Sequence, residues 1–275
     1  MKDLLMNKVP ILGVIGCGQM AYAVIKGLKG YPEELVSALY VCDVNSERTA
    51  LFVQEFAAVA EVASEVVEAA DVVLLAVKPQ QMMEVLRSTA RHWNEQKLII
   101  SVAAGIPTTA IEAVLPGPVP VIRTMPNMAA FIGKSATALC AGHYATAEHL
   151  SLAEAYMQCI GQTFLYPEKN VDAFGAVAGS GPAYVCLVLE AWVDAAVMQG
   201  IPLHDAEAMV MQTMQGTLEL LAEEKISINE LKRRICSPGG TTIRALQKLE
   251  DQGVRSGFFA AVQAAYDRSV ELSKS

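Results

Sequence analysis

Two glycine-rich segments at opposite ends of the chain contain the residue types best suited to bind a small molecule. In the C-terminal segment, residues 237–242 read Ser-Pro-Gly-Gly-Thr-Thr and run into a helical pattern. Gly240 lets the backbone approach a ligand closely, and the unpaired N–H groups in the first turn of a helix bind anions. Thr241 and Thr242 would therefore offer N–H groups to a carboxylate and a hydroxyl beside it. The alternative is an ordinary helix cap, in which threonine satisfies the helix end.

The N-terminal segment, residues 13–21, reads Gly-Val-Ile-Gly-Cys-Gly-Gln-Met-Ala and follows an apolar run. The spacing Gly16-x-Gly18-x-x-Ala21 matches the dinucleotide fingerprint. In that fingerprint the first glycine turns the chain, the second admits the pyrophosphate, and the third small residue packs helix on strand. A strand pattern precedes this segment and a helical pattern follows it, so the segment predicts a nucleotide site.

A second apolar run, residues 38–42, ends in Asp43. An acid at the end of the second strand typically binds the ribose hydroxyls, about 20 residues past the glycines, and Asp43 lies somewhat further along. The alternative is an acid that ends a strand or caps a helix. Both interpretations remain open at the level of sequence.

The net charge of the chain indicates which kinds of partner it is unsuited to bind. The net charge is −8, and the only basic run, Lys232-Arg233-Arg234, lies in a helical pattern. We therefore expect no nucleic-acid partner and no anionic membrane surface. Hydrophobic residues make up 53% of the chain, yet no apolar run is predicted to reach membrane-spanning length. Residues 1–8 lack the pattern of a signal peptide, which predicts a cytoplasmic protein.

The metal-binding and nucleophilic residues form no recognisable site. The four histidines and six cysteines are scattered and match no metal-ligand spacing. Five cysteines lie in apolar segments, where reduced core cysteines are common, and Cys17 lies in the glycine-rich turn. The sequence contains no G-x-S-x-G and no P-loop. We predict no metal site and find little support for nucleophilic hydrolysis or phosphoryl transfer.

The elements that must position these residues alternate between strand and helix up to about residue 166. Near-continuous Val, Leu and Ile runs are typical of a parallel sheet covered on both faces. The alternation predicts a doubly wound α/β fold of Rossmann type, whose ligands lie beyond the carboxyl ends of the strands. Strands are predicted at 10–15, 37–42, 71–77, 98–103, 119–123, 136–140 and 162–166. Helices are predicted at 19–28, 46–57, 79–92 and 109–114, the last with a Thr109/Glu112 capping box.

Strand patterns disappear after residue 167, which divides the chain into a nucleotide-binding domain (1–167) and an all-helical domain (168–275). The helical domain is predicted to contain helices at 182–199, 204–222, 227–236, 240–251 and 256–273. The helix at 182–199 is apolar nearly all round and must be buried. A domain this small has few layers with which to surround it. A second subunit is the simplest cover, so we expect an obligate dimer.

Several motifs occur along the chain in one order. They are Ile15-Gly-Cys-Gly-Gln-Met-Ala21, Ala76-Val-Lys-Pro79, Ser101-Val-Ala-Ala-Gly105, Met125-Pro-Asn127, Gly179-Ser-Gly-Pro-Ala-Tyr184 and Ser237-Pro-Gly-Gly-Thr-Thr-Ile243. Together they resemble pyrroline-5-carboxylate reductase, the last enzyme of proline biosynthesis. The resemblance spans nearly the whole chain, and its helical-domain motifs are the specific ones.

The resemblance implies a Rossmann domain, a helical dimerisation domain and reduction of 1-pyrroline-5-carboxylate to L-proline by NADPH or NADH. It also implies that dimers assemble further, often into a ring of five. The substrate contacts would be Thr241, Thr242 and Glu168, with Gly240 beside them. The nucleotide contacts would be Ile15, Gly16, Cys17, Gly18, Gln19, Met20, Ala76, Val77, Lys78, Pro79, Val102, Ala103 and Ala104.

The expected chemistry suits these residues. The substrate carboxylate matches the helix start at Thr241 and Thr242. The Thr242 hydroxyl would serve the imine nitrogen and is the predicted catalytic group. Hydride transfer itself belongs to the cofactor, and no strong acid is required because the imine can carry its proton in from solvent.

The sequence also departs from the family pattern. Met128-Ala129 stands where Thr-Pro is usual, and Arg234 and Ala63 stand where some members place asparagines that contact the nucleotide. Asp43 replaces the small polar residue common in NADPH-using members. Because a carboxylate binds ribose hydroxyls but repels a 2′-phosphate, Asp43 favours NADH, unless the nearby cation Arg48 offsets the repulsion.

Two other functions fit the same two-domain plan. One is a dehydrogenase of hydroxy acids, which would need a Lys or His general base. The helical-domain motifs contain no histidine. The other is a relative that binds nucleotide without catalysis, against which the intact Gly-Gly-Thr-Thr segment argues.

Overall fold

The computed structural model describes residues 8–274 and divides them into two compact units. The first unit runs to Ser180 and includes the end of the chain from Ala265, and the second is Gly181–Ala264. The expectation about a signal peptide falls on residues 1–8, of which 1–7 lie outside the described residues.

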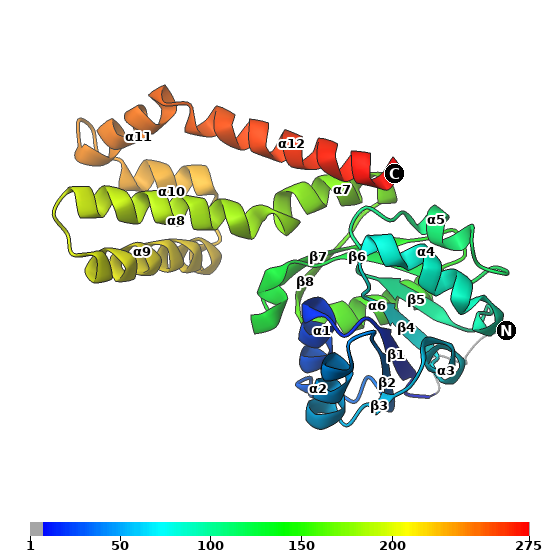
Figure 1. Cartoon of the computed structure of the whole chain (residues 1–275). Helices are drawn as coiled ribbons and strands as arrows, with labels where there is room; N and C mark the ends of the chain where they lie inside the picture. Colours follow the sequence, from blue (N-terminus) through cyan, green and yellow to red (C-terminus); the bar gives the residue numbers. More distant parts are fainter. Residues whose placement is uncertain (1–7, 275) are drawn as a thin grey trace. The chain divides into compact units, whose positions relative to one another are not determined.

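The first unit contains one eight-stranded sheet (Figure 1). All pairs are parallel except β6 with β7, which are antiparallel. The seven predicted strands are present, and the short β3 was not predicted. In spatial order the strands are β3 (Val59–Ala60), β2 (Ala38–Cys42), β1 (Ile11–Ile15), β4 (Val72–Leu75), β5 (Leu98–Ser101), β6 (Val121–Met125), β7 (Ser135–Ala141) and β8 (Gly161–Leu165).

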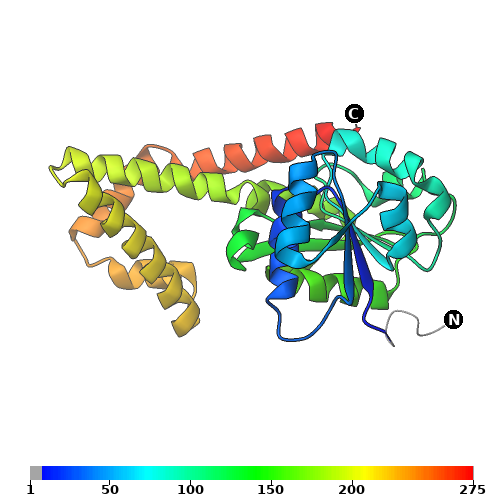
Figure 2. The ribbon, with the colours of Figure 1, turned by 60° about the horizontal axis from the view of Figure 1, so that its bottom comes forward.

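Helices cover both faces of the sheet (Figures 1 and 2). One core joins the strands to α1 (Gln19–Lys29), α2 (Ser46–Phe56) and α6 (Ala147–Gln158). The other joins them to α3 (Ala63–Ala69), α4 (Pro79–Ser88) and α5 (Thr108–Glu112). Strands such as β4 and β5 are buried at every residue, which explains their continuous apolar sequence. The predicted doubly wound fold is confirmed.

The strand order changes direction between β1 and β4. The chain passes from β1 outward to β2 and β3, then returns to β4 on the other side of β1. Ligands of doubly wound sheets bind at this switch point, beyond the carboxyl ends of the strands. Ile15 and Leu75 are register partners at that edge, so the fold brings the segments that follow them together.

The capping box predicted for one helix is absent, and a capping box occurs at another helix instead. The Thr109/Glu112 capping box is wrong, because α5 begins at Thr108 after Pro107 and has no side-chain cap at its own N-terminus. Glu112 instead accepts the His143 backbone N–H at 2.7 Å. A capping box does occur at α6, where Thr146 and His149 each accept a backbone N–H from the other.

The long helical segment Glu168–Met198 starts earlier than predicted. It passes through a 3₁₀ turn (Glu168–Asn170), α7 (Val171–Phe174) and a π-helical turn, η4 (Gly175–Gly179), before α8 (Gly181–Met198). Pro182 lacks an N–H and crowds the carbonyl four residues back, that of Ala178. The Asn127 side chain donates to this carbonyl at 2.9 Å. The backbone group left free by the proline is therefore satisfied from the loop after β6.

The second unit consists of α8, α9 (Leu203–Glu224), α10 (Ile228–Ile235), α11 (Thr241–Asp251) and the first part of α12 (Val254–Lys274). Helices α8 and α9 lie side by side as a hairpin, which Figure 1 shows in yellow-green and olive. Of the apolar residues described in this unit, only Ala206, Val210 and Leu231 are buried. No residue of α8 is buried. A single copy of the unit therefore has almost no core.

The expectation about membrane-spanning length is wrong for one element. Within the described residues, Glu168–Met198 is long and apolar enough to cross a membrane by length and composition, and 6% of its apolar window is buried. The sequence did not predict this length, because Glu190 and Asp194 divide the segment into short apolar runs. The same composition is expected of a helix buried between subunits.

Candidate functional site

The turn after β1 fits a closely bound ligand. Gly16 has φ +96°, a left-handed conformation, and a side chain there would lie 2.7 Å from the Ala76 carbonyl group. Only glycine allows β1 and the segment after β4 to approach so closely. A Cβ on Gly18 would meet no atom within 4 Å, so the second fingerprint glycine faces open space. The geometry agrees with the two roles that the fingerprint assigns to these glycines.

Asp43 joins the glycine-rich turn to the start of α2. Its Oδ2 accepts the Cys17 N–H at 2.7 Å, and its Oδ1 accepts the Asn45 N–H at 2.8 Å. Asn45 in turn caps α2 through the Glu47 N–H. Asp43 therefore braces the strand end, as the second sequence interpretation predicts, and each of its oxygens keeps a lone pair that can accept a hydroxyl hydrogen bond.

The Cys17 thiol is buried inside the turn. Its Sγ lies 3.7 Å from the Cys42 carbonyl oxygen. Burial, followed by the charge of Asp43, raises the pKa of Cys17 to about 12. The thiol is therefore uncharged at neutral pH and adds no negative charge where phosphates would approach.

Two further predicted segments follow β4 and β5 at the same edge of the sheet. Lys78 is exposed and caps α4, whose first residue is Pro79. After β5, the Ala103 N–H donates to Ser101 Oγ at 3.3 Å, and Gly105 adopts φ +71°. The fold therefore brings together, at the switch point and beside it, the predicted nucleotide contacts Ile15 to Met20, Asp43, Ala76 to Pro79 and Val102 to Ala104.

The predicted carboxylate site lies in the helical unit. Gly240 is the N-cap of α11 and, because it has no side chain, it does not cap the N–H groups of the first turn. Gly239 has φ +69°, and a side chain on Gly240 would collide with Ser237. The threonines occupy the first two helical positions, so neither of them is the cap. Their backbone N–H groups belong to the unpaired first turn, as the anion-site interpretation requires.

Glu168 is held by partners within the first unit. Its two oxygens accept the Thr108 N–H and hydroxyl, each at 2.7 Å. Arg123 Nη1 lies 3.5 Å from Oε1, while its Nη2 lies 2.7 Å from Asp172. The strand predicted at 119–123 ends at Arg123, but its sequence pattern predicted no role for this residue. The available signal was a single arginine within the apolar run of β6, since a buried cation needs carboxylate partners.

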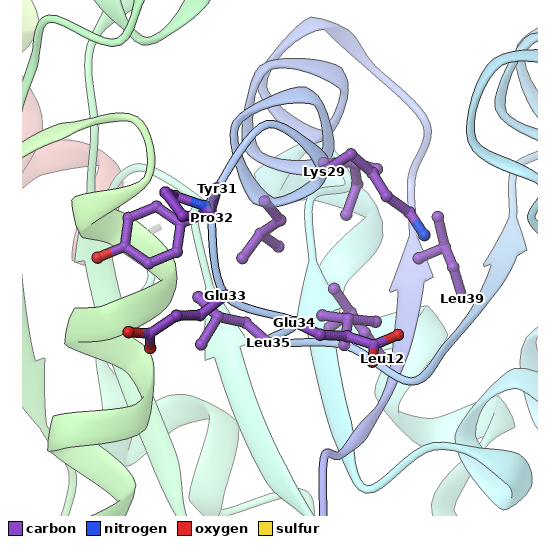
Figure 3. A pocket seen from close by; sticks show the side chains of 11 residues that line it. Leu12, Lys29, Tyr31, Pro32, Glu33, Glu34, Leu35 and Leu39 are labelled. Carbon is purple, nitrogen blue, oxygen red and sulfur yellow. The ribbon is translucent and has the colours of Figure 1, made fainter.

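A separate hollow lies at the opposite edge of the sheet. It encloses about 290 Å³ between the start of β1, the end of α1 and the loop to β2. Figure 3 shows Leu12 and Leu39 beside Lys29 and the acidic Glu33 and Glu34. None of the predicted site residues lines this hollow. Among the described residues, no group of three or more His, Cys, Asp or Glu side chains could hold a metal ion.

Comparisons with known proteins match two parts of the chain to known families. Residues 168–272 match the family described as pyrroline-5-carboxylate reductase dimerisation. Residues 11–105 match the family described as NADP oxidoreductase, coenzyme F420-dependent. A pyrroline-5-carboxylate reductase from Synechocystis is 38% identical over 96% of this chain and 98% of its own length. The chain belongs to the pyrroline-5-carboxylate reductase family.

Other members of the family support the same assignment. The Escherichia coli reductase is 32% identical over 96% of this chain and 98% of its own length. The solved structure of the Coxiella burnetii reductase has a TM-score of 0.89 at 32% identity and covers 98% of this chain and 100% of that one. A Plasmodium falciparum reductase solved with NADP bound has a TM-score of 0.85 at 25% identity, over 96% of this chain and 98% of that one.

Family membership confirms three of the sequence predictions at a coarse level. The chain is an oxidoreductase with a nicotinamide-dinucleotide domain. It carries the dimerisation domain of its family, and α8, whose apolar surface is uncovered in one copy, lies inside that domain. It is therefore a homo-oligomer that acts on a small molecule.

Proposed function

We propose that this protein reduces 1-pyrroline-5-carboxylate to L-proline with hydride from NADH or NADPH. The observation that carries the proposal is the similarity to reductases of that name over 96% of the chain, through both units. We divide the work between residues 1–167, which bind the nucleotide, and residues 168–275, which bind substrate and form the dimer. The intact Gly-Gly-Thr-Thr segment supports catalysis over nucleotide sensing.

The dinucleotide would lie across the carboxyl edge at the switch point. Its pyrophosphate fits the space beside Gly18 and the first turn of α1, where no side-chain cap satisfies the N–H groups. Gly16 holds the turn against Ala76. Bound there, the cofactor supplies the hydride.

The substrate carboxylate would bind the N–H groups at the start of α11, with Gly240 leaving room for it. The Thr242 hydroxyl would hydrogen-bond the ring nitrogen as it changes from imine to amine. Glu168 would contact the substrate through the lone pairs that Thr108 and Arg123 leave free. These groups bind and orient the substrate, and holding reactants in place can contribute about 7–11 kcal/mol.

We propose a preference for NADH over NADPH. Asp43 presents a carboxylate where the adenosine ribose would lie, and it is fixed there by two backbone N–H groups. A fixed carboxylate accepts hydrogen bonds from ribose hydroxyls and repels a 2′-phosphate. Arg48, on α2 and partly exposed, is the cation that would offset this repulsion if it reached back.

We propose an obligate dimer built from intertwined helical domains, with further assembly into a ring of five dimers. The helical unit has an apolar groove of about 680 Å³ lined by residues that include Leu249, Phe258 and Phe259. On α8, Leu187 is 66% exposed and Trp192 is 44% exposed. Such surfaces exceed what one soluble copy normally leaves uncovered. We also propose a cytoplasmic location, which cell fractionation would test.

The decisive experiment mixes purified protein with pyrroline-5-carboxylate and either NADH or NADPH. We expect loss of the reduced nicotinamide absorbance and an equal amount of L-proline. A folded protein that binds nucleotide but makes no proline with either cofactor would contradict the proposal. Turnover of a hydroxy acid in its place would point to the alternative dehydrogenase.

A further inference from the structure

Five side chains from four separated elements meet around Arg123, and we call them the Arg123 cluster: Thr108, Arg123, Glu168, Asp172 and Ser269. The guanidinium contacts Glu168 at 3.5 Å and Asp172 at 2.7 Å. Ser269 Oγ donates to the same Asp172 oxygen at 3.1 Å. The arginine side chain is 2% exposed, and the two acids are 27% and 16% exposed. The cluster is a buried ionic centre, not a surface salt bridge.

The cluster lies beside the segment after β5. Arg123 on β6 is the register partner of Ser101, the last residue of β5. Partners in register project to the same face of a sheet. Ser101 is followed by residues 102–107, which lead directly to Thr108. The segment is thus fixed at one end by the sheet and at the other by the two hydrogen bonds from Thr108 to Glu168.

Residues 102–107 are also held by packing and by backbone hydrogen bonds. Ala103 is buried and Ile106 packs against the core, while the Pro107 carbonyl accepts from the first turn of α5. Val102 N–H bonds the Leu75 carbonyl at 3.1 Å, and Ala103 N–H bonds Ser101 Oγ at 3.3 Å. Beyond these, Ala104 is exposed and Gly105 has a left-handed φ of +71°. The Glu168 carboxylate therefore acts as a distant cap on α5, and Arg123 sets the orientation of that carboxylate. Movement of Glu168 would remove the two hydrogen bonds that fix Thr108 at the far end of the segment.

We propose that Arg123 is a positioning residue for the nicotinamide half of the cofactor. It acts through Glu168 and Thr108, which hold residues 102–107 in place. In a doubly wound sheet the two halves of a dinucleotide lie on opposite sides of the switch point, so β4–β6 face the nicotinamide half and β1–β3 the adenosine half. The adenosine half, next to Asp43, lies outside the influence of the cluster. The inference rests on the proposed function in assigning residues 102–104 to the cofactor.

The arginine itself is not replaceable by another cation. Its planar guanidinium reaches two carboxylates at once, which the single ammonium of lysine cannot do in the same geometry. Among the described residues, Arg123 Nε is the buried side-chain polar atom without a hydrogen-bond partner. A buried donor left unpaired is costly, and the guanidinium bears this cost while its two terminal nitrogens contact Glu168 and Asp172.

The test compares the protein's affinity for the whole dinucleotide with its affinity for the adenosine half alone. Calorimetry measures the affinities of the preferred reduced dinucleotide and of its fragment that lacks nicotinamide, ADP-ribose or its 2′-phosphate. The variants are Thr108→Val, which keeps the ion pairs, and Arg123→Lys, which keeps the charge. Arg268→Lys is the control, because Arg268 pairs with Glu271 on the exposed surface.

We expect Thr108→Val and Arg123→Lys to weaken the affinity for the whole dinucleotide by about 3- to 10-fold. This is less than the roughly 10- to 100-fold that direct loss of a hydrogen bond to a charged group would cost, because the cluster reaches the cofactor only through residues 102–107. Affinity for the fragment should stay at the wild-type value in both variants. Thr108→Ser, which keeps the hydroxyl that bonds Glu168, should bind both ligands with wild-type affinity. Equal loss for both ligands, or no loss for either, would overturn the inference. Because binding is measured without substrate, failure to make proline would count against the proposed function and leave this result unaffected.

Discussion

At the scale of single residues, Thr242 carries the sharpest prediction. It is the second residue of α11, whose N-cap is Gly240. Thr242→Ala should lower kcat by about 10²- to 10³-fold if its hydroxyl acts as a preorganised donor, with nucleotide affinity unchanged. Thr242→Ser, which keeps the hydroxyl, should retain most of the activity. Wild-type kcat in the alanine variant would reduce this residue to a helix former.

Asp43 carries the prediction on cofactor choice. Wild-type protein should have the higher kcat/KM with NADH, and Asp43→Ser should shift the ratio toward NADPH, because the fixed negative charge is removed. The same change also removes the acceptor for the Cys17 N–H. Asp43→Asn is the matched control, since it keeps an acceptor oxygen while losing the charge. A wild type that already prefers NADPH, or an unchanged ratio in both variants, would refute the charge argument.

At the scale of elements, α6 should make stability depend on pH. Neutral His149 Nδ1 accepts the Thr146 N–H at 3.0 Å, and burial lowers the pKa of His149 below its ordinary value of 6.5. The folded state therefore binds fewer protons than the unfolded chain. The contribution to stability is fully present above about pH 6.5 and is lost as the pH falls toward the lowered pKa.

His149→Gln isolates this effect, because glutamine keeps an acceptor in a capping box and does not titrate. We expect the wild-type melting temperature to fall more steeply than that of the variant between about pH 6.5 and pH 5. Parallel curves over that range would show that the cap does not depend on the protonation state of the histidine.

Some strands and helices could be predicted from the sequence with ease, and others could not be predicted at all. Strands such as β4 and β5 are buried on both faces, so their apolar runs were unambiguous. The two-residue β3 has both residues exposed and gave no pattern. The start of the long helix at Glu168 was missed because Gly179 and Pro182 resemble a helix beginning. The structure keeps the helix continuous there with a π-helical turn and a hydrogen bond from Asn127.

The candidate site likewise contains residues that the sequence could predict and one residue, Arg123, whose role it could not. Gly16, Gly18 and Asp43 could be proposed from sequence because they belong to a motif whose members have a characteristic spacing along the chain. Arg123 depends on Glu168 and Asp172, whose proximity to it only the fold reveals. Removing a partner from such a buried pair costs about 3–5 kcal/mol, yet one sequence contains no trace of the pairing beyond the arginine itself.

At the scale of the whole molecule, assembly and stability should be inseparable. Light scattering at micromolar concentration should give a mass above the 29.4 kDa of one chain, and the melting temperature should rise with protein concentration. Leu187→Glu on α8, where the residue is 66% exposed, should weaken assembly by burying a charge. Val59→Glu on edge strand β3, 44% exposed, is the control. A monomer, or equal effects of both variants, would contradict this account.

The nearly coreless helical unit also bears on how the protein is made in a cell. A newly synthesised chain can complete its sheet alone, but it leaves α8 uncovered until another chain arrives. During that interval the exposed apolar surface is open to chaperones, proteases and aggregation. The yield of enzyme should therefore depend on how fast chains are produced near one another. Slow expression should favour degradation of lone chains, and a variant that pairs more tightly should accumulate to a higher level without any gain in turnover.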